Sequence, residues 1–177
     1  IHECLKSQYI DKYIVSTDCE EIAEIALSHG AEVPFIRPSK LASDSASSAD
    51  ALIHAVNWAK KDDDNYDIVV EAMATNPLKK AIHIDHCIQL MEDNGYPYCT
   101  AVQELNDHHP ARIKYLENGI MKDFFPEVLE SRRQDLEPQA YIRAGSIYCM
   151  TTDALLATGA RYGKDNTLAY VLPDEFV

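Results

Sequence analysis

The sequence lacks the patterns that would place it in a membrane or on nucleic acid. No apolar run approaches the roughly 20 residues of a membrane-spanning helix, so we predict no membrane as a partner. Basic side chains are few, with 16 Lys and Arg against 29 Asp and Glu and a formal net charge of -13. Such a charge repels phosphate polyanions, so the composition argues against nucleic acid as a partner. An anionic small ligand would need a local basic pocket.

The sequence also lacks any cysteine pairing pattern. The five cysteines are odd in number and scattered, with no Cys-x-x-Cys pair: Cys4, Cys19, Cys87, Cys99 and Cys149. This usage is typical of a reducing compartment rather than of a disulfide framework. We therefore predict a cytoplasmic protein.

Hydrophobic periodicity predicts alternating strands and helices in one domain over 1–177. A first helix is expected after a cap at Asp18, with Ile22, Ala23, Ile25 and Ala26 as its apolar face. Further helices are expected from Ser47 or Ser48 to about Lys61, over 81–94, and from Thr151 or Thr152 to Gly159. Strands are expected at 13–17, 33–36, 68–73, 98–103, 146–150 and 168–172. This order predicts an α/β fold, a three-layer αβα sandwich with a mostly parallel, Rossmann-like sheet.

One segment interrupts the alternation. Residues 112–117 and 120–125 flank Asn118-Gly119, the preferred turn of a β-hairpin. We interpret 104–140 as an inserted hairpin region that serves as a lid or a subunit contact.

Polar side chains follow several predicted strands. In α/β sheets of this kind, ligands bind at the carboxyl ends of the strands. Asp18, Arg37, Thr75 and Asn76 all fall there, so we expect a binding site at this edge.

An ordered set of motifs resembles a known family. The motifs are Val15-Ser-Thr-Asp18, Arg37-Pro-x-x-Leu-Ala-x-Asp-x-x-Ser-Ser48, Thr75-Asn-Pro-Leu-Lys79, His108-His109-Pro110, and Arg132-Arg-Gln-Asp-Leu136 followed by Gly145-Ser-Ile-Tyr148. Their order and spacing resemble the CMP-N-acylneuraminate (sialic acid) cytidylyltransferases, including legionaminic-acid-type members. The fold would then be of the nucleotide-diphospho-sugar transferase type, with the hairpin region used for dimerisation.

The resemblance implies an enzyme that transfers CMP from CTP to the anomeric hydroxyl of a nine-carbon acidic sugar and releases pyrophosphate. Mg²⁺ would be the cofactor, and CTP, the sugar acid and a second copy of the chain would be the partners. It implies nucleotide binding by Asp18, Arg37, Ser47 and Ser48, and sugar binding by Met73, Thr75, Asn76, Arg112, Arg133 and Tyr141. Arg112 and Arg133 would hold the sugar carboxylate, in the partner subunit's site if the hairpins exchange. No catalytic residue is assigned.

The chain departs from the family pattern in several places. The family's basic, Gly-rich phosphate loop would lie before Ile1 and its Asp-x-Asp metal site after Val177, so we expect truncation at both ends and metal ligands outside the chain. Met73 stands where the family has Gln, and Lys79 where it has Arg, which leaves the identity of the sugar open. An eight-carbon ketodeoxy acid, or a non-catalytic binding module on the same fold, is the alternative.

Other interpretations of single residues stay open at this point. Ser48 can be a helix cap as well as a ligand contact, Arg37 a surface ion pair, and Thr75 and Asn76 turn residues ahead of Pro77. His83, His86 and Cys87 have a spacing that can hold zinc. Surface histidines beside a core cysteine explain the same spacing, and we favour that explanation. We expect Tyr148 to pack in the core.

Overall fold

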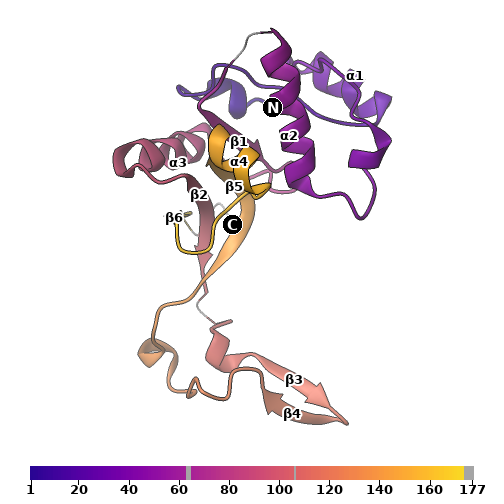
Figure 1. Ribbon diagram of the computed structural model, residues 1–177. Helices are drawn as coiled ribbons and strands as arrows, with labels where there is room; N and C mark the ends of the chain where they lie inside the picture. Colours follow the sequence, from indigo (N-terminus) through magenta and orange to yellow (C-terminus); the bar gives the residue numbers. More distant parts are fainter. Residues whose placement is uncertain (63–64, 106, 174–177) are drawn as a thin grey trace.

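A computed structural model describes residues 1–62, 65–105 and 107–173 (Figure 1). Position 106 of the predicted insertion and positions 174–177 of the predicted domain lie outside the described residues. The helices are α1 (Glu20–Ser28), α2 (Ser48–Ala59), α3 (Ala81–Asn94) and α4 (Thr152–Thr158). The strands are β1 (Ile68–Ala72), β2 (Tyr98–Glu104), β3 (Lys114–Glu117), β4 (Ile120–Asp123), β5 (Tyr141–Thr151) and β6 (Thr167–Val171).

The central sheet is mixed, with the order β1-β5-β2-β6. β5 pairs antiparallel with both β1 and β2, whereas β2 pairs parallel with β6. β1, β2 and β6 therefore share one direction, and β5 runs against them between two of them. The predicted α/β class is confirmed, and three of the four strands of this sheet share one direction. Two of its three pairings are antiparallel, however, so the sheet is mixed. The antiparallel β5 is the feature that periodicity did not reveal, because a buried strand has the same pattern in either direction.

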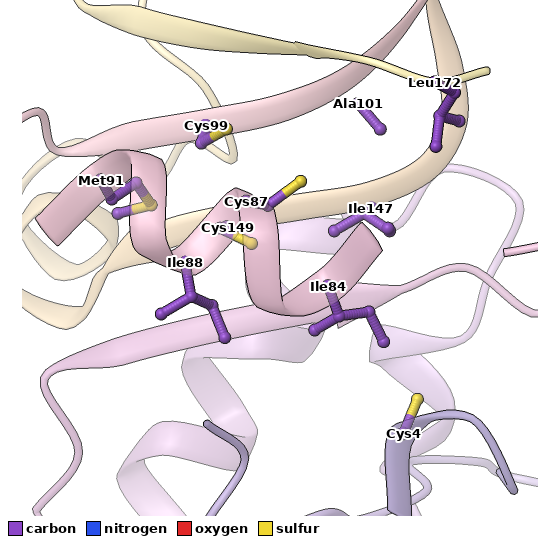
Figure 2. Packing of buried hydrophobic residues seen from close by; sticks show 10 residues of the cluster. All are labelled: Cys4, Ile84, Cys87, Ile88, Met91, Cys99, Ala101, Ile147, Cys149 and Leu172. Atoms are coloured by element: carbon purple, nitrogen blue, oxygen red, sulfur yellow. The ribbon is translucent and has the colours of Figure 1, made fainter. Parts of the chain in front are cut away.

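Helices cover both faces of this sheet. Alternate residues of β5 point to opposite faces, and Ile147 and Cys149 belong to one buried cluster while Tyr148 and Met150 belong to another. The first cluster lies under α3, whose Ile84, Cys87, Ile88 and Met91 pack onto the sheet (Figure 2). The second lies under α2 and α4. These two clusters hold the sheet in place and fix where its strand ends lie.

The first two predicted strands are reduced to short parallel contacts. Isolated bridges join Ile14 to Glu32 and Thr17 to Ile36, and no strand is assigned at 13–17 or 33–36. Pro34 explains part of this difference, because proline has no backbone N–H to give to a ladder. The two segments still lie side by side, so Asp18 and Arg37 leave the same edge.

The start of α1 differs from the sequence prediction. The N-cap is Cys19, with no capping hydrogen bond from a side chain, so the cap predicted at Asp18 is wrong. Ala23 and Ala26 are buried as expected, but Ile22 and Ile25 are each 52% exposed. The helix therefore packs through its small residues.

Helix caps elsewhere follow the sequence. Ser47 Oγ accepts a hydrogen bond from the Ala49 N–H at 3.1 Å, and Thr151 Oγ1 accepts one from the Ala154 N–H at 3.2 Å. These bonds satisfy backbone donors that the first turn of a helix leaves free. They set the start of α2 beside the site described below.

The hairpin of β3 and β4 projects from the body as an arm (Figure 1). Its turn places Asn118 at φ 53° and Gly119 at φ 80°, the left-handed conformation that this turn requires. β5 leaves the arm and enters the central sheet through a register shift opposite Thr100 and Val102, where Gly145 has φ 61°. The predicted hairpin is confirmed, and its use in dimerisation stays a prediction. Within the described ranges, no helix is long and apolar enough to cross a membrane.

Candidate functional site

A cavity of about 570 Å³ lies along β1, an outer strand of the described sheet. Its other walls are α2 and the segment from Tyr9 to Ser16. Three residues named from the sequence line it together: Arg37 and Ser48 of the predicted nucleotide set, and Met73 of the predicted sugar set. The fold thus brings members of both predicted sets to a single cavity. The volume is in the range of small-molecule sites.

Arg37 is held at the cavity wall by its backbone. Its N–H donates to the Thr17 carbonyl at 2.7 Å, which follows from the parallel contact of the two N-terminal segments. Its Nη2 lies 3.5 Å from Asp18 Oδ1, so these two predicted residues are neighbours. The ion pair considered for Arg37 is therefore present. It is long and half-exposed, and such a pair contributes little to stability.

Two buried polar atoms on this wall have no hydrogen-bond partner among the described residues. They are Arg37 Nε and Ser16 Oγ. A buried donor or acceptor without a partner costs free energy, and native structures rarely tolerate one unless a ligand or water completes it. Ser16 stands inside the motif that opens the family resemblance, but the sequence analysis did not single it out. A hydroxyl two residues before the predicted ligand residue Asp18 was the available signal.

Ser47 and Ser48 have different surroundings. Ser47 is the N-cap of α2, whereas Ser48 is the first helical residue and lines the cavity. The N-terminus of α2, which begins at Ser48, carries the positive end of the helix dipole and suits an anion. A contact between either hydroxyl and a nucleotide stays a prediction.

The loop after β1 carries the other predicted sugar residues. Asn76 Oδ1 accepts a hydrogen bond from the Leu78 N–H at 3.2 Å, a turn that leaves Thr75 exposed. Lys79 closes the loop, because its Nζ donates to the carbonyls of Met73 and Asn76. Burial lowers the pKa of Lys79 from its ordinary value. The loop is thus fixed from beneath, while the exposed Thr75 and the half-buried Asn76 stay accessible.

The two arginines predicted to hold a carboxylate meet at the base of the arm. Arg112 Nη1 lies 3.9 Å and Arg133 Nη1 3.4 Å from the same Asp107 carboxylate oxygen. The fold therefore gathers two guanidinium groups on one protein carboxylate, and their predicted contact with a sugar carboxylate stays a prediction. Tyr141, at the start of β5, is 44% exposed. None of these three lines the cavity along β1.

Other residues named in the sequence have structural surroundings. His109 is buried at the base of the arm, where its ring accepts from the Ala111 N–H and contacts the Pro138 carbonyl. Tyr148 is 6% exposed in the second core cluster, as expected.

The described residues offer no metal centre. No group of three or more His, Cys, Asp or Glu side chains in those residues could hold an ion. In the spacing considered for zinc, Cys87 is buried in the core, His83 accepts from the Lys80 N–H, and His86 lies 3.2 Å from the Tyr170 hydroxyl. The expectation of a core cysteine is confirmed, whereas the expectation of surface histidines is wrong, because His83 is buried and His86 is half-buried. Mg²⁺ as a cofactor stays a prediction.

A charged pair next to the cavity was missed. Glu71 of β1 lines the cavity and accepts a hydrogen bond from Arg161 Nη1 at 2.6 Å. A carboxylate within an otherwise apolar strand, Ile68–Ala72, was the signal in the sequence. Such a group demands a partner, and only the fold shows that Arg161 supplies it.

Comparisons with known proteins identify the family of this chain. The family model described as cytidylyltransferase matches residues 1–122. A pseudaminic acid cytidylyltransferase of Campylobacter jejuni is 33% identical over 178 residues, which cover 100% of this chain and 75% of that protein. An N-acylneuraminate cytidylyltransferase of Escherichia coli is 26% identical over 175 residues, covering 99% of this chain and 40% of that protein. A CMP-N,N'-diacetyllegionaminic acid synthase of Legionella pneumophila is 30% identical over 91 residues, covering 51% of this chain and 39% of that protein.

A solved structure shares the fold. CMP:2-keto-3-deoxy-manno-octonic acid synthetase complexed with CTP superposes with a TM-score of 0.67 over 97% of this chain and 76% of that one, at 14% identity. The match of the family model to most of the chain, together with the full-length similarity to the Campylobacter protein, identifies the family. This chain therefore belongs to the cytidylyltransferase family of enzymes.

Proposed function

We propose that the protein transfers CMP from CTP to the anomeric hydroxyl of a nine-carbon acidic sugar, with release of pyrophosphate. The observation that carries this proposal is the cavity along β1, which unites Arg37 and Ser48 with Met73. The relatives support it, because those named above act on pseudaminic acid, N-acylneuraminate and N,N'-diacetyllegionaminic acid. Two of these names, N-acylneuraminate and N,N'-diacetyllegionaminic acid, state that the sugar acid carries N-acyl groups.

In this reaction the anomeric oxygen attacks the α-phosphorus of CTP. A new oxygen–phosphorus bond forms, the bond to the β-phosphate bridge breaks, and the hydroxyl proton is released. The chain contributes positioning and charge, which supply most of the rate enhancement in phosphoryl-type transfers. Arg37 can bind phosphate oxygens through the nitrogen that now lacks a partner. The loop at Thr75 and Asn76 would orient the sugar next to Met73. No described residue is assigned as the base.

We propose Mg²⁺ as the cofactor, where it would neutralise the triphosphate. No cluster of three or more His, Cys, Asp or Glu side chains among the described residues could hold the ion, so none of them is assigned as a ligand. The expected result is that EDTA abolishes pyrophosphate release and that added Mg²⁺ restores it. Activity that survives full chelation would rule out this cofactor.

The sugar is best identified by testing a panel of candidate acids as substrates. Met73 stands at the position where the sialic-acid type has Gln, and the relatives differ in their acids, so we propose a pseudaminic, legionaminic or sialic acid. The test measures pyrophosphate release by the intact gene product with CTP, Mg²⁺ and a panel of nine- and eight-carbon acids. Turnover of a nine-carbon acid supports the proposal. CTP binding without turnover would favour a non-catalytic module, and turnover of the eight-carbon acid alone would change the substrate class.

We also propose that the protein is a homodimer joined through the arm, and that it works in the cytoplasm. The arm exposes large apolar side chains that a monomer would leave in water: Tyr115, Leu116, Ile120, Met121, Phe124 and Leu129. Burying them against a second copy would remove this cost and would bring Arg112 and Arg133 to another subunit. All five cysteines are free thiols, which supports a reducing compartment.

A further inference from the structure

Arg161 crosses from the loop after α4 to the end of β1. Its Nη1 donates to Glu71 Oε2 at 2.6 Å and lies 4.0 Å from Met73 Sδ. Its guanidinium carbon lies 4.5 Å from the centre of the Tyr148 ring, in the position of a cation–π contact. These three contacts fix the Arg161 guanidinium beside Met73, which precedes the loop that carries Thr75 and Asn76.

The sheet register explains why these contacts converge. Glu71 and Tyr148 are directly opposite each other on β1 and β5, so their side chains share one face. Both side chains of the ion pair are mostly buried, with 22% of Arg161 and 17% of Glu71 exposed. A pair this sheltered is expensive to build from stability alone, because removing two charges from water offsets most of their attraction. A role toward a ligand would account for its presence.

Arg161 retains donors that the protein does not use. A guanidinium has five N–H groups, and Glu71 engages Nη1. In the part of the chain that the structure describes, Nε and Nη2 of Arg161 make no hydrogen bond to the protein, and neither is a fully buried atom. These nitrogens are therefore open to a group outside the protein.

The surroundings of these donors indicate what that group is. The Met73 thioether and the Tyr148 ring provide an apolar wall, and the guanidinium provides donors beside it. An acylamido group matches both features, because its methyl is apolar and its carbonyl oxygen accepts hydrogen bonds. A hydroxyl matches only the donor.

We propose that Arg161 is a specificity-determining residue that donates to an acylamido carbonyl of the sugar acid beside Met73, and that Glu71 positions it. This inference rests on the proposed function, since it needs a nine-carbon acid in the site. It assigns a role to a charged pair that lies outside the motifs described above. CTP binding is not expected to depend on it.

The test compares KM for sugar and CTP, kcat, and thermal unfolding in four variants of the intact protein. Arg161→Met keeps the stem and removes the donors, Arg161→Lys keeps the charge but not the fork, and Glu71→Gln removes the positioning charge. Arg132→Met is the matched control, because Arg132 is a 76% exposed arginine that pairs with Asp135 on the arm. Each is measured with the best N-acylated acid and with its analogue that has a hydroxyl in place of the acylamido group.

We expect Arg161→Met to raise KM for the N-acylated acid roughly 10- to 100-fold, the effect of one charged hydrogen bond, with KM for CTP unchanged. KM for the hydroxyl analogue should change little. Glu71→Gln should give a smaller rise of the same kind, and Arg132→Met none. If Arg161→Met does not fold, Arg161→Lys decides by the same comparison of the two acids.

Two results would overturn the inference separately from the function. The role of Arg161 alone is refuted if the wild type is active and the Arg161 variants have unchanged KM values for both sugar acids. It is also refuted if these variants raise KM for the sugar and for CTP equally. Loss of thermal stability with unchanged KM values would likewise show that the pair only ties the loop to β1. A wild type that turns over none of the nine-carbon acids refutes the proposed function, and this inference with it.

Discussion

Arg37 is a residue whose backbone is fixed by the fold while part of its side chain remains available for a ligand. Its backbone N–H donates to the Thr17 carbonyl, its Nη2 lies 3.5 Å from Asp18, and its buried Nε has no hydrogen-bond partner among the described residues. In a chain with a formal net charge of -13, Arg37 is one of three cationic residues that line the cavity, with Lys12 and Lys60. An anion that completes its hydrogen bonds would gain more there than at an exposed arginine.

We therefore predict that Arg37→Ala weakens CTP binding roughly 10- to 100-fold, because a charged hydrogen-bond donor to phosphate is lost. KM for the sugar should stay nearly the same. Calorimetric titration of CTP and steady-state kinetics measure the two effects. Lys40→Ala, an exposed cation three residues away, is the control. Equal weakening of CTP and sugar would contradict a role in nucleotide binding.

The cysteines are residues whose chemistry the fold suppresses. Cys4, Cys87, Cys99 and Cys149 are buried, whereas Cys19 is partly exposed. A hydrogen bond with Cys149, followed by burial, raises the pKa of the Cys87 thiol, and a hydrogen bond with Cys87 raises that of Cys99. Because the thiolate is the reactive form, we predict that a thiol reagent at pH 8 modifies Cys19 first. Rapid modification of several thiols in the native protein would contradict this packing.

The same shifts predict a pH dependence of stability. The unfolded chain loses these thiol protons near the ordinary pKa of 9.0, whereas the folded chain keeps them at that pH. The folded state then binds more protons, so the free energy of unfolding falls as pH rises above about 9. Urea unfolding between pH 8 and 10 measures this slope. Cys87→Ala should make the slope shallower than in the wild type.

At the scale of elements, the start of α2 combines two functions in adjacent residues. Ser47 caps the helix, and Ser48 faces the cavity one position later. A helix N-terminus needs a side-chain acceptor for its free N–H groups, and it also attracts anions. The sequence alone allowed either serine to have either role.

The two serines can be separated by mutation. We predict that Ser47→Ala lowers the free energy of unfolding by about 0.5–2 kcal/mol, the usual cost of a lost N-cap. Ser48→Ala should leave stability nearly unchanged and weaken CTP binding. Urea denaturation and calorimetric titration of both variants give the two quantities. A stability loss confined to Ser48→Ala would reverse the assignment.

At the scale of the whole molecule, the arm separates two parts of the predicted site. Arg112 and Arg133 lie at its base around Asp107, while Arg37 and Met73 line the cavity beside β1. The exposed apolar side chains of β3 and β4 need a cover, and a second copy of the arm offers the same surface. A site shared between subunits would join the two groups.

This arrangement predicts complementation between inactive subunits. Arg37→Ala and Arg133→Ala chains should each have low activity, the second through a raised KM for the sugar. Mixing equal amounts after unfolding and refolding should recover roughly a quarter of wild-type activity, because half of the dimers are mixed and each twofold dimer of that kind has one intact site. No recovery would argue against a shared site.

Much of the architecture was determined by local sequence. The helix at 81–94, the hairpin turn at Asn118-Gly119 and the cap at Thr151 follow from periodicity, backbone conformation and side-chain donors within a few residues. The ordered motifs likewise indicated the cytidylyltransferase family, which the comparisons then established.

Tertiary structure decided what depends on residues far apart in the chain. The direction of β5, the exposure of Ile22 and Ile25, and the union of Arg37, Ser48 and Met73 on one cavity all follow from long-range packing. The same holds for Arg161, which is 90 residues from the carboxylate that it pairs with. Local patterns determine which residues form an element, because those forces act over a few residues. Only packing places one element beside another, because burial and charge pairing act between surfaces that the sequence separates.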